Sequence, residues 1–504
     1  MGRLDAPPAR GAAPRADSAR LTPAQWREIE TDWKEARLLA SIQFEARSPG
    51  LAHDGEGYRP APEADDIKRR LNRGRIEALR RAAREIHPFD SKRNHPSRIY
   101  NCGRVSQFGA DVDTYYGRRK NGDVSLYGTQ SCGRAWECAV CRSRLALAHA
   151  AEIGTALRRW HEAGYHALFV TLTIRHSYGD SLLAMREGMA AAWGNFTSGR
   201  QWLEWRRGNG AEYVLALDIT HGDNGWHAHY HAIVFTKTEL DADESRAWFH
   251  DRWVRFVSAK MGRPHVGTRA NMVAVEAVER TSEGEEKVGR YISKMGFEMV
   301  ADLNKTLPKP GGGRTPWAIL ESATETRDFA RYAFAKGRDN AEAVSDLSKR
   351  ETAIWCDYVA GLYRARWVRW SEGIREELDL GAPLDDSCAD AVAAALDGPE
   401  PEGPPTIEAR IPHELRKVLL FHRTANAAIQ DALERRIPLG PLLGLWLTCT
   451  EQAIWDECNS RESLDEFAKT IQAKRLEKRA ERDKRKREKA EEKAGDVDRS
   501  TSGK

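Results

Sequence analysis

Gly225-Trp226-His227-Ala228-His229-Tyr230-His231-Ala232-Ile233-Val234-Phe235 is a strand-like run with histidines at three alternate positions. Side chains at positions i, i+2 and i+4 of a strand point to one face, so His227, His229 and His231 project together. Imidazole is the commonest metal ligand in proteins, so this face predicts a site for one divalent ion. The alternative is a polar strand face that is covered by solvent or by hydrogen bonds.

A second strand is predicted just before the histidine run. Residues 213–220 have strand character, and residues 221–225, His-Gly-Asp-Asn-Gly, have the composition of a turn. Two strands joined by such a turn predict an antiparallel hairpin. Asp218 is then placed to face the histidines, where it competes with His227 to be the third ligand beside His229 and His231.

The rest of the central segment mixes strand and helix patterns. Residues 167–174 are apolar and β-branched, which predicts a buried strand. Helices are predicted at 144–163, 239–261 and 283–299. This order predicts an α+β fold, in which a central antiparallel sheet is flanked by helices that lie on one face.

Composition and charge divide the chain into several segments. We expect a disordered arm and basic helical region (1–95), a segment with the cysteines and the predicted sheet (96–325), a helical extension (326–380), a linker rich in proline and acidic residues (381–406), a small helical unit (407–472) and a charged tail (473–504). The basic helix at 65–86 either contacts phosphates or has a solvated face. The tail is either a solvated helix or disordered.

Overall composition limits the class of protein. The 504 residues are 41% hydrophobic and 31% charged, with a formal net charge of +4. Because no run of about 18 apolar residues occurs, we expect no membrane-spanning helix. The first residues lack the apolar core of a secretion signal. With 8 cysteines and no disulfide-like framework, we expect a reducing cytoplasm.

Four cysteines lie close together in the sequence. Cys132, Cys138 and Cys141 are spaced as Cys-x5-Cys-x2-Cys, and Cys102 lies upstream. Four thiolates suit a structural Zn²⁺ ion, with His149 as a substitute for the distant Cys102. The alternative is a set of free buried thiols. The other cysteines are scattered, and we interpret them as structural: Cys356, Cys388, Cys449 and Cys458.

A tyrosine with a nearby lysine follows the histidine strand. Tyr291 and Lys294 share one face of a predicted helix, at i and i+3. A phenol has a pKa of about 10, so it needs a metal ion or a cation nearby to attack at neutral pH. The alternative is a packing tyrosine beside a solvent-facing lysine.

Three motifs therefore follow in order: Phe169-Val-Thr-Leu-Thr173, His229-Tyr-His231 and Tyr291-Ile-Ser-Lys294. This set resembles the motifs of the HUH endonuclease superfamily, in particular the rolling-circle replication initiators (Rep proteins) of bacterial plasmids. The resemblance spans roughly residues 100–320. Residues 314–320 resemble a further Arg-x-Pro-aromatic segment of such proteins, and residues 364–373 resemble a helical region in actinobacterial initiators.

The resemblance implies a site and a reaction. His229 and His231 would bind Mg²⁺ or Mn²⁺, and Tyr291, with Lys294 as its helical partner, would attack origin DNA. The product would be a covalent 5′-phosphotyrosine and a free 3′-OH. The implied partners are plasmid origin DNA, single-stranded or extruded at the nick site, and host replication proteins.

One position departs from the family pattern. Some initiators have a glutamate four residues before the tyrosine that activates water, and here Lys287 occupies that position. Glu286 is the nearest candidate for this role. Other interpretations are an HUH relaxase or transposase, and a zinc-dependent DNA-binding regulator without catalysis. Relaxases usually have their tyrosine before the histidines, whereas Tyr291 follows them.

Overall fold

The computed structural model describes residues 64–86, 89–90, 95–96, 98–118, 124–262, 272–278, 313–381, 406–421 and 425–501. The chain divides into two compact units, one formed by 1–61 with 323–350 and the other by 62–322 with 351–504. The central sheet, the four clustered cysteines and the histidine strand all belong to the second unit.

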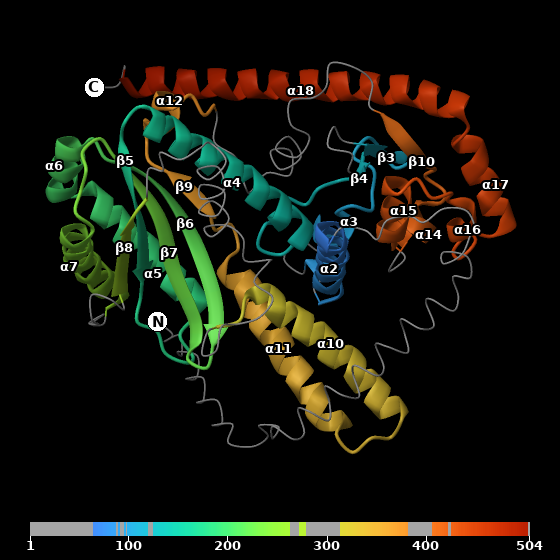
Figure 1. Ribbon diagram of the computed structural model, residues 1–504, viewed down its shortest axis with the longest axis horizontal. Helices are drawn as coiled ribbons and strands as arrows, with labels where there is room; N and C mark the ends of the chain where they lie inside the picture. Colours follow the sequence, from blue (N-terminus) through green and yellow to red (C-terminus); the bar gives the residue numbers. More distant parts are fainter. Residues whose placement is uncertain are drawn as a thin grey trace, which may run out of the picture. The chain divides into compact units, whose positions relative to one another are not determined.

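A five-stranded antiparallel sheet forms the centre of the second unit (Figure 1). Its strands are β5 (His166–Thr173), β6 (Glu212–Gly222), β7 (Gly225–Thr236), β8 (Val273–Ala277) and β9 (Val368–Trp370). They pair in the order β8-β5-β7-β6-β9, so β7 is central and β9 lies at an edge. The predicted α+β class with a central antiparallel sheet is confirmed.

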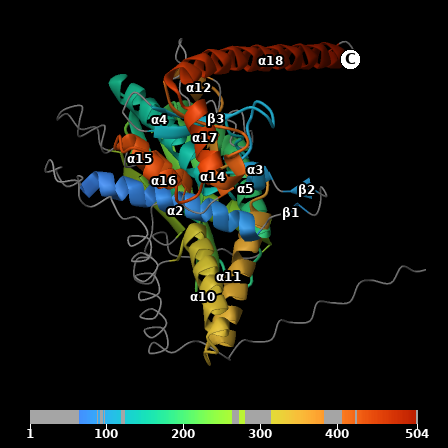
Figure 2. The ribbon, with the colours of Figure 1, turned by 90° about the vertical axis from the view of Figure 1, so that its right-hand side faces the viewer.

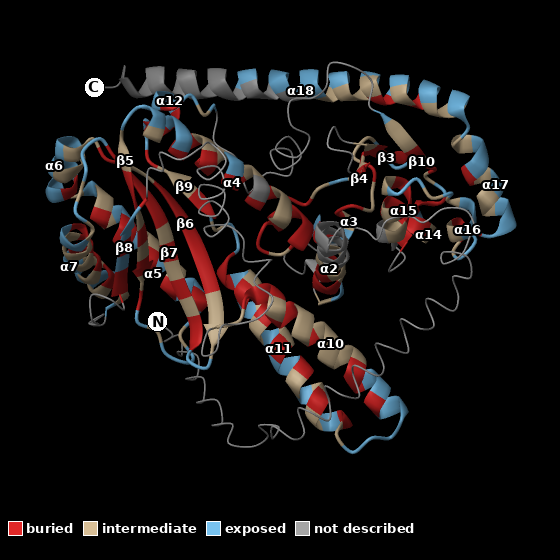
Figure 3. Cartoon of the chain, viewed as in Figure 1, coloured by how far each residue is buried: buried red, intermediate tan, exposed pale blue. Residues whose placement is uncertain are grey.

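Helices cover both faces of this sheet, so the prediction of helices on one face only is wrong. Trp160 of α4 (Ala139–Glu162) lies 5.6 Å from Phe235, ring centre to ring centre. Trp193 of α5 (Leu182–Ser198) lies 6.4 Å from Tyr230, on the opposite face of β7. The reason is that β5, β6 and β7 carry buried apolar residues on both faces along much of their length, and Figure 3 shows these strands as largely buried. Two more helices lie beside α5, namely α6 (Arg200–Asn209) and α7 (Ala242–Met261).

The predicted hairpin is present as β6 and β7. Its register pairs Asp218 with His229 and Gly222 with Gly225. Gly225 has a φ of +83°, a left-handed conformation that suits glycine at the end of a hairpin turn. A residue distant in sequence also fixes the tip of the hairpin, because Trp226 Nε1 donates a hydrogen bond to Asp357 Oδ2 at 2.6 Å.

The segment 326–380 is only partly helical. It contains most of α10 (Pro316–Ala335), α11 (Ala341–Gly361) and α12 (Ile374–Glu377), but residues 368–370 form strand β9. The prediction of a helical extension is therefore wrong at β9, where Val368 pairs with Ala216 on the edge of the sheet. Within the first unit, the ends of α10 and α11 enclose a small core: Phe329, Ala330, Ala333, Ala341 and Val344.

A second, three-stranded sheet joins distant parts of the sequence. Strand β10 (Ile407–Ile411) pairs with β3 (Thr114–Arg118), which pairs with β4 (Val124–Tyr127). The segment 407–472 is thus not purely helical, because its first strand completes a sheet begun near residue 114. Its helices are α14 (Arg416–Phe421), α15 (Ala425–Glu434), α16 (Gly440–Leu443), α17 (Cys449–Cys458) and the start of α18.

The charged tail is helical as far as it is described. Helix α18 (Arg461–Thr501) continues without a break into the segment predicted as either a solvated helix or disordered (Figure 1 and Figure 2). The predicted basic helix is present as α2 (Ala64–Ile86). The remaining short elements are β1 (Phe89–Asp90), β2 (His95–Pro96) and α3 (Arg98–Asn101). Among the described residues, no helix is long and apolar enough to cross a membrane.

Replacing Gly225 tests the hairpin turn. A Cβ atom there would lie 3.3 Å from the Cα of Tyr178, in a left-handed backbone conformation. We expect Gly225→Ala to lower the free energy of unfolding, measured with urea, by about 1–2 kcal/mol. Gly208→Ala is the control, because Gly208 is helical with open space around it. It should raise stability by about 0.5–1 kcal/mol. Equal stability of Gly225→Ala and wild type would contradict the turn geometry.

Candidate functional site

Three ligand atoms from the β6–β7 hairpin converge on one point. Nε2 of His229 lies 3.1 Å from Nε2 of His231 and 3.2 Å from Oδ2 of Asp218. Nε2 of His231 lies 3.8 Å from the same carboxylate oxygen. Metal–ligand bonds of about 2.1 Å place adjacent ligand atoms roughly 3.0–3.4 Å apart. The three residues therefore fit one divalent ion with little movement.

The strand register explains this convergence. Asp218 pairs with His229, and His231 is two residues further along the same strand, so all three side chains project from one face. Along β7 the histidines are half-buried while the residues between them are buried. Asp218 is buried, and its Oδ1 accepts a hydrogen bond from the backbone N–H of Ile219 at 2.8 Å. The sheet thus fixes the carboxylate while its other oxygen faces the imidazoles.

His227 lies outside this group. Its Nδ1 lies 2.8 Å from Nε2 of His176, so these two rings share a hydrogen bond. Burial, together with the neighbouring His229 and His176, lowers the pKa of His227 to about 4. Of the two candidates for third ligand, the geometry favours Asp218. The contact with His176 was not predicted, because that residue comes from a loop far away in the sequence.

Strand β5 orients the second histidine. Thr171 Oγ1 lies 3.1 Å from Nδ1 of His231, and Thr171 pairs with His231 in the sheet. The ring of Phe169 stacks on the His231 imidazole at 5.3 Å between centres. A hydrogen bond at Nδ1 sets the tautomer that leaves Nε2 free to bind a metal. The Thr-Leu-Thr run therefore has a positioning role that sequence reasoning did not assign.

Arg314 binds the hairpin next to its turn. Its backbone exchanges two hydrogen bonds with His221, of 2.8 and 2.9 Å. Its guanidinium forms two hydrogen bonds to Glu351, of 2.7 and 2.9 Å. Trp317, just downstream, is fully buried. The Arg-x-Pro-aromatic segment thus supports the hairpin in this structure.

The four predicted zinc ligands form one buried cluster. The sulfur of Cys102 lies 3.8 Å from those of Cys138 and Cys141, and Cys132 lies 3.5 Å from Cys141. All four are at most 2% exposed. A disulfide needs about 2.05 Å between sulfurs, whereas tetrahedral Zn²⁺ with bonds of about 2.3 Å needs about 3.8 Å. The spacing therefore fits a zinc ion, without the substitute His149.

The electrostatic surroundings favour a thiolate at Cys102, whereas burial raises the pKa of Cys132 and Cys138 well above the usual value of a thiol. Hydrogen bonds from neighbouring thiols, and then the charge of Arg80, lower the pKa of Cys102 well below its usual range. Arg84 donates from its Nε to the carbonyl of Ile99 at 3.0 Å, and it also donates to the carbonyl of Cys102. Two buried arginines of α2 thus offset the negative charge of a thiolate cluster.

A third group of possible ligands contains Asp113, His413 and Glu414. Asp113 Oδ1 accepts from the backbone N–H of His413 at 2.8 Å, and its carboxylate pairs with Arg410. The group therefore has a structural explanation as a link between the loop before β3 and the loop after β10. Three further candidate residues, Tyr291, Lys294 and Glu286, lie outside the described residues.

Comparisons with known proteins point to replication. Residues 123–295 match the sequence profile of a family described as Replication protein. The chain is 25% identical over 251 residues to a neomycin resistance protein of Streptomyces cyanogenus, a match that covers 40% of this chain and 57% of that protein. It is 25% identical over 327 residues to a protein rep of Streptomyces lividans, covering 55% and 71%. No solved structure gives a significant match.

Two substitutions distinguish the candidates for third metal ligand. Asp218→Asn keeps the shape but removes the charge, so we expect its affinity for Mn²⁺ to fall at least about tenfold. His227→Gln should change the affinity by less than about twofold, because His227 pairs with His176. Isothermal titration calorimetry measures both. A large loss in His227→Gln with none in Asp218→Asn would assign the third ligand to His227 instead.

Proposed function

We propose that this chain is a plasmid replication initiator that nicks origin DNA and rejoins it through a phosphotyrosine at Tyr291. The observation that carries the proposal is the convergence of Asp218, His229 and His231 on one point. A second support is that residues 123–295, which resemble a replication protein, include these ligands and Tyr291. The working setting would be the cytoplasm, with origin DNA and host replication proteins as partners.

The donor set indicates which ion would be held. Two imidazoles and one carboxylate form a mixed nitrogen and oxygen site. Mg²⁺ prefers an all-oxygen shell, whereas imidazole suits softer divalent ions. The site therefore suits Mn²⁺ better than Mg²⁺. When bound, the ion would supply positive charge that polarises the scissile phosphate.

The chain's own residues would perform the bond changes. The phenol oxygen of Tyr291 attacks the phosphorus, and the bond to the 3′ oxygen breaks. The phenol gives up its proton, and the departing oxygen takes one up to become a free 3′-OH. Lys294 would stabilise the phenolate or the phosphate. Attack of a 3′-OH on the phosphotyrosine reverses the step and rejoins the strand.

Ending the reaction by hydrolysis would need a group that activates water. Glu286 is the candidate, because Lys287 occupies the position where some initiators have their glutamate. A carboxylate can remove a proton from water as the water attacks the phosphotyrosine. The bond between phosphorus and the Tyr291 oxygen would then break. The DNA would keep a 5′-phosphate with the hydroxyl from water, and the Tyr291 oxygen would take up a proton.

Nicking of a supercoiled plasmid that carries the gene region tests the proposal. With Mn²⁺, we expect wild-type protein to yield nicked circles and a covalent protein–DNA adduct. Tyr291→Phe should give neither, since it lacks the attacking oxygen. Tyr332→Phe is the matched control, because this half-exposed tyrosine lies outside the candidate site, and it should nick as wild type does.

The alternatives predict other results. An adduct that persists in Tyr291→Phe would place the nucleophile elsewhere, as expected of a relaxase with an upstream tyrosine. Tight DNA binding without nicking on any supercoiled or single-stranded substrate would contradict the proposal and favour a non-catalytic regulator.

We also propose that Cys102, Cys132, Cys138 and Cys141 hold a structural Zn²⁺ ion. The support is the tetrahedral spacing of four buried sulfurs. Such an ion would tie the loop around residue 102 to the start of α4, which leads into β5. A reducing cytoplasm would keep the thiols available for the metal.

Metal analysis of the purified protein tests the zinc proposal. We expect elemental mass spectrometry to find about one Zn²⁺ per wild-type chain. Cys138→Ser should lose the zinc and several kcal/mol of stability, because metal binding is coupled to folding. Cys449→Ser is the control, since this cysteine is exposed and outside the cluster, and it should keep both. Wild-type protein without zinc, at full stability, would contradict the proposal.

A further inference from the structure

A large groove runs along the free edge of β9. It has a volume of about 1740 Å³, and its walls come from the loop before α4, from α4 and α5, and from residues 359–381. Pockets for small molecules typically enclose about 300–1,000 Å³. The groove is therefore large enough for an extended ligand.

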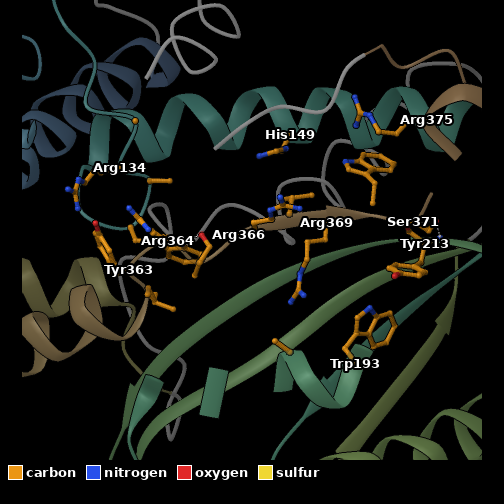
Figure 4. A pocket seen from close by; sticks show the side chains of 18 of the residues that line it. Arg134, His149, Trp193, Tyr213, Tyr363, Arg364, Arg366, Arg369, Ser371 and Arg375 are labelled. Carbon is orange, nitrogen blue, oxygen red and sulfur yellow. Dashed lines mark hydrogen bonds between the residues drawn. The ribbon is translucent and has the colours of Figure 1, made fainter. Parts of the chain in front are cut away.

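One end of the groove is rich in arginine. Figure 4 shows Arg134, Tyr363, Arg364 and Arg366 together at this end, with Arg369 midway. No lysine is among the described residues that line the groove. The acidic lining residues are Glu137, which pairs with Arg134, and a group near the other end: Glu372, Glu376 and Asp379. Arginines therefore predominate at one end of the groove, the basic end, whereas the other end carries these carboxylates together with Arg375.

An exposed aromatic ring lies within the basic end. Tyr363 is 41% exposed, and the guanidinium carbons of Arg134 and Arg364 each lie 5.4 Å from its ring centre. Guanidinium groups beside an exposed ring form a surface on which a base can stack while its phosphates meet positive charge. Proteins that bind single-stranded nucleic acid use this combination.

The backbone of Arg364 has an unusual conformation. Arg364 has a φ of +57° in the turn that follows α11, a backbone conformation that glycine adopts most easily. A side chain in the left-handed region is unfavourable, and such residues often cluster at functional sites. At this position the Arg364 guanidinium lies beside the ring of Tyr363.

One residue of the basic end, Arg366, continues the strand β9 alongside the strand that carries Asp218. The backbone N–H of Leu217 donates to the carbonyl of Trp367 at 3.1 Å, and Ala216 pairs with Val368. This antiparallel register brings Arg366 to the level of Asp218. Three buried ring nitrogens in the walls also lack hydrogen-bond partners among the described residues: His149 Nε2, Trp193 Nε1 and Trp370 Nε1. The walls therefore offer buried polar groups as well as charge.

We infer that the basic end of this groove binds a single strand of DNA, with Arg364 and Arg366 on its phosphates and Tyr363 stacked on a base. The inference rests on the proposed function, because nicking requires an unpaired strand near the metal centre. Beyond the proposed function, the inference gives the path of the DNA strand, which would run from the metal centre across the edge of β9.

Binding of a fluorescein-labelled oligodeoxythymidine of about 20 nucleotides tests the inference. Fluorescence anisotropy is measured without added Mn²⁺ or Mg²⁺, so binding is separate from nicking. We expect Tyr363→Ala to weaken binding about tenfold and Tyr363→Phe, which keeps the ring, less than about twofold. Arg366→Gln should weaken binding and lower the slope of log affinity against log salt by about 0.7.

Arg364→Gly gives the sharpest comparison. It removes one charge and relieves the left-handed backbone, so binding should weaken about threefold to tenfold while the urea midpoint does not fall. Arg436→Gly is the matched control, because Arg436 is also exposed with a φ of +56° but lies outside the groove. It should relieve the same strain and leave binding unchanged.

The outcomes separate the two proposals. Wild-type affinity in Tyr363→Ala, Arg364→Gly and Arg366→Gln would overturn the groove assignment, even if the protein nicks DNA. Equal weakening by Arg436→Gly, or equal affinity for duplex DNA of the same length, would also overturn it in favour of general attraction to charge. Weakened binding in the groove variants, with no nicking by wild type, would overturn the proposed reaction and leave the groove assignment standing.

Discussion

The register of the β6–β7 hairpin is the constraint on which the candidate site depends. A shift by one residue would turn every side chain of β7 to the other face of the sheet. The pairing of Asp218 with His229 then would be lost, and so would the contact of His231 with Thr171. The left-handed Gly225, the bridge from Arg314 and the buried flanks of the strands all hold this register.

Elements distant in sequence surround the hairpin and position its side chains. Strand β5 orients His231 from one side, and β9 extends the sheet on the other side. The cysteine cluster lies where α4 begins, and α4 in turn packs against the sheet through Trp160. A candidate metal centre, a cysteine cluster and a basic groove are thus built on one sheet and its connections.

Local patterns predicted the parts of the site that lie on one hairpin or in one short motif. Alternation and a turn sequence were enough to place His229, His231 and Asp218 on one face. Spacing was enough to suggest the cysteine cluster, although the distance from Cys102 to the others in sequence made its membership uncertain. Tyr291 stays a prediction, since it lies outside the described residues.

Other features depend on contacts that no local pattern encodes. Strand β9 has three residues, too few to show a period, and it exists because β6 offers an edge. His176 contacts His227 in the folded chain although the two residues are far apart in the sequence. The groove combines residues from separated segments of the chain, so the net charge of the whole chain does not reveal the charge of the groove.

Anomalous diffraction from crystals soaked in Mn²⁺ tests the central claim, that the hairpin register builds one metal centre, most directly. The account predicts one strong peak about 2.2 Å from Nε2 of His229, Nε2 of His231 and Oδ2 of Asp218. A peak bound instead by His176 and His227, or Mn²⁺ found only away from the hairpin, would contradict it.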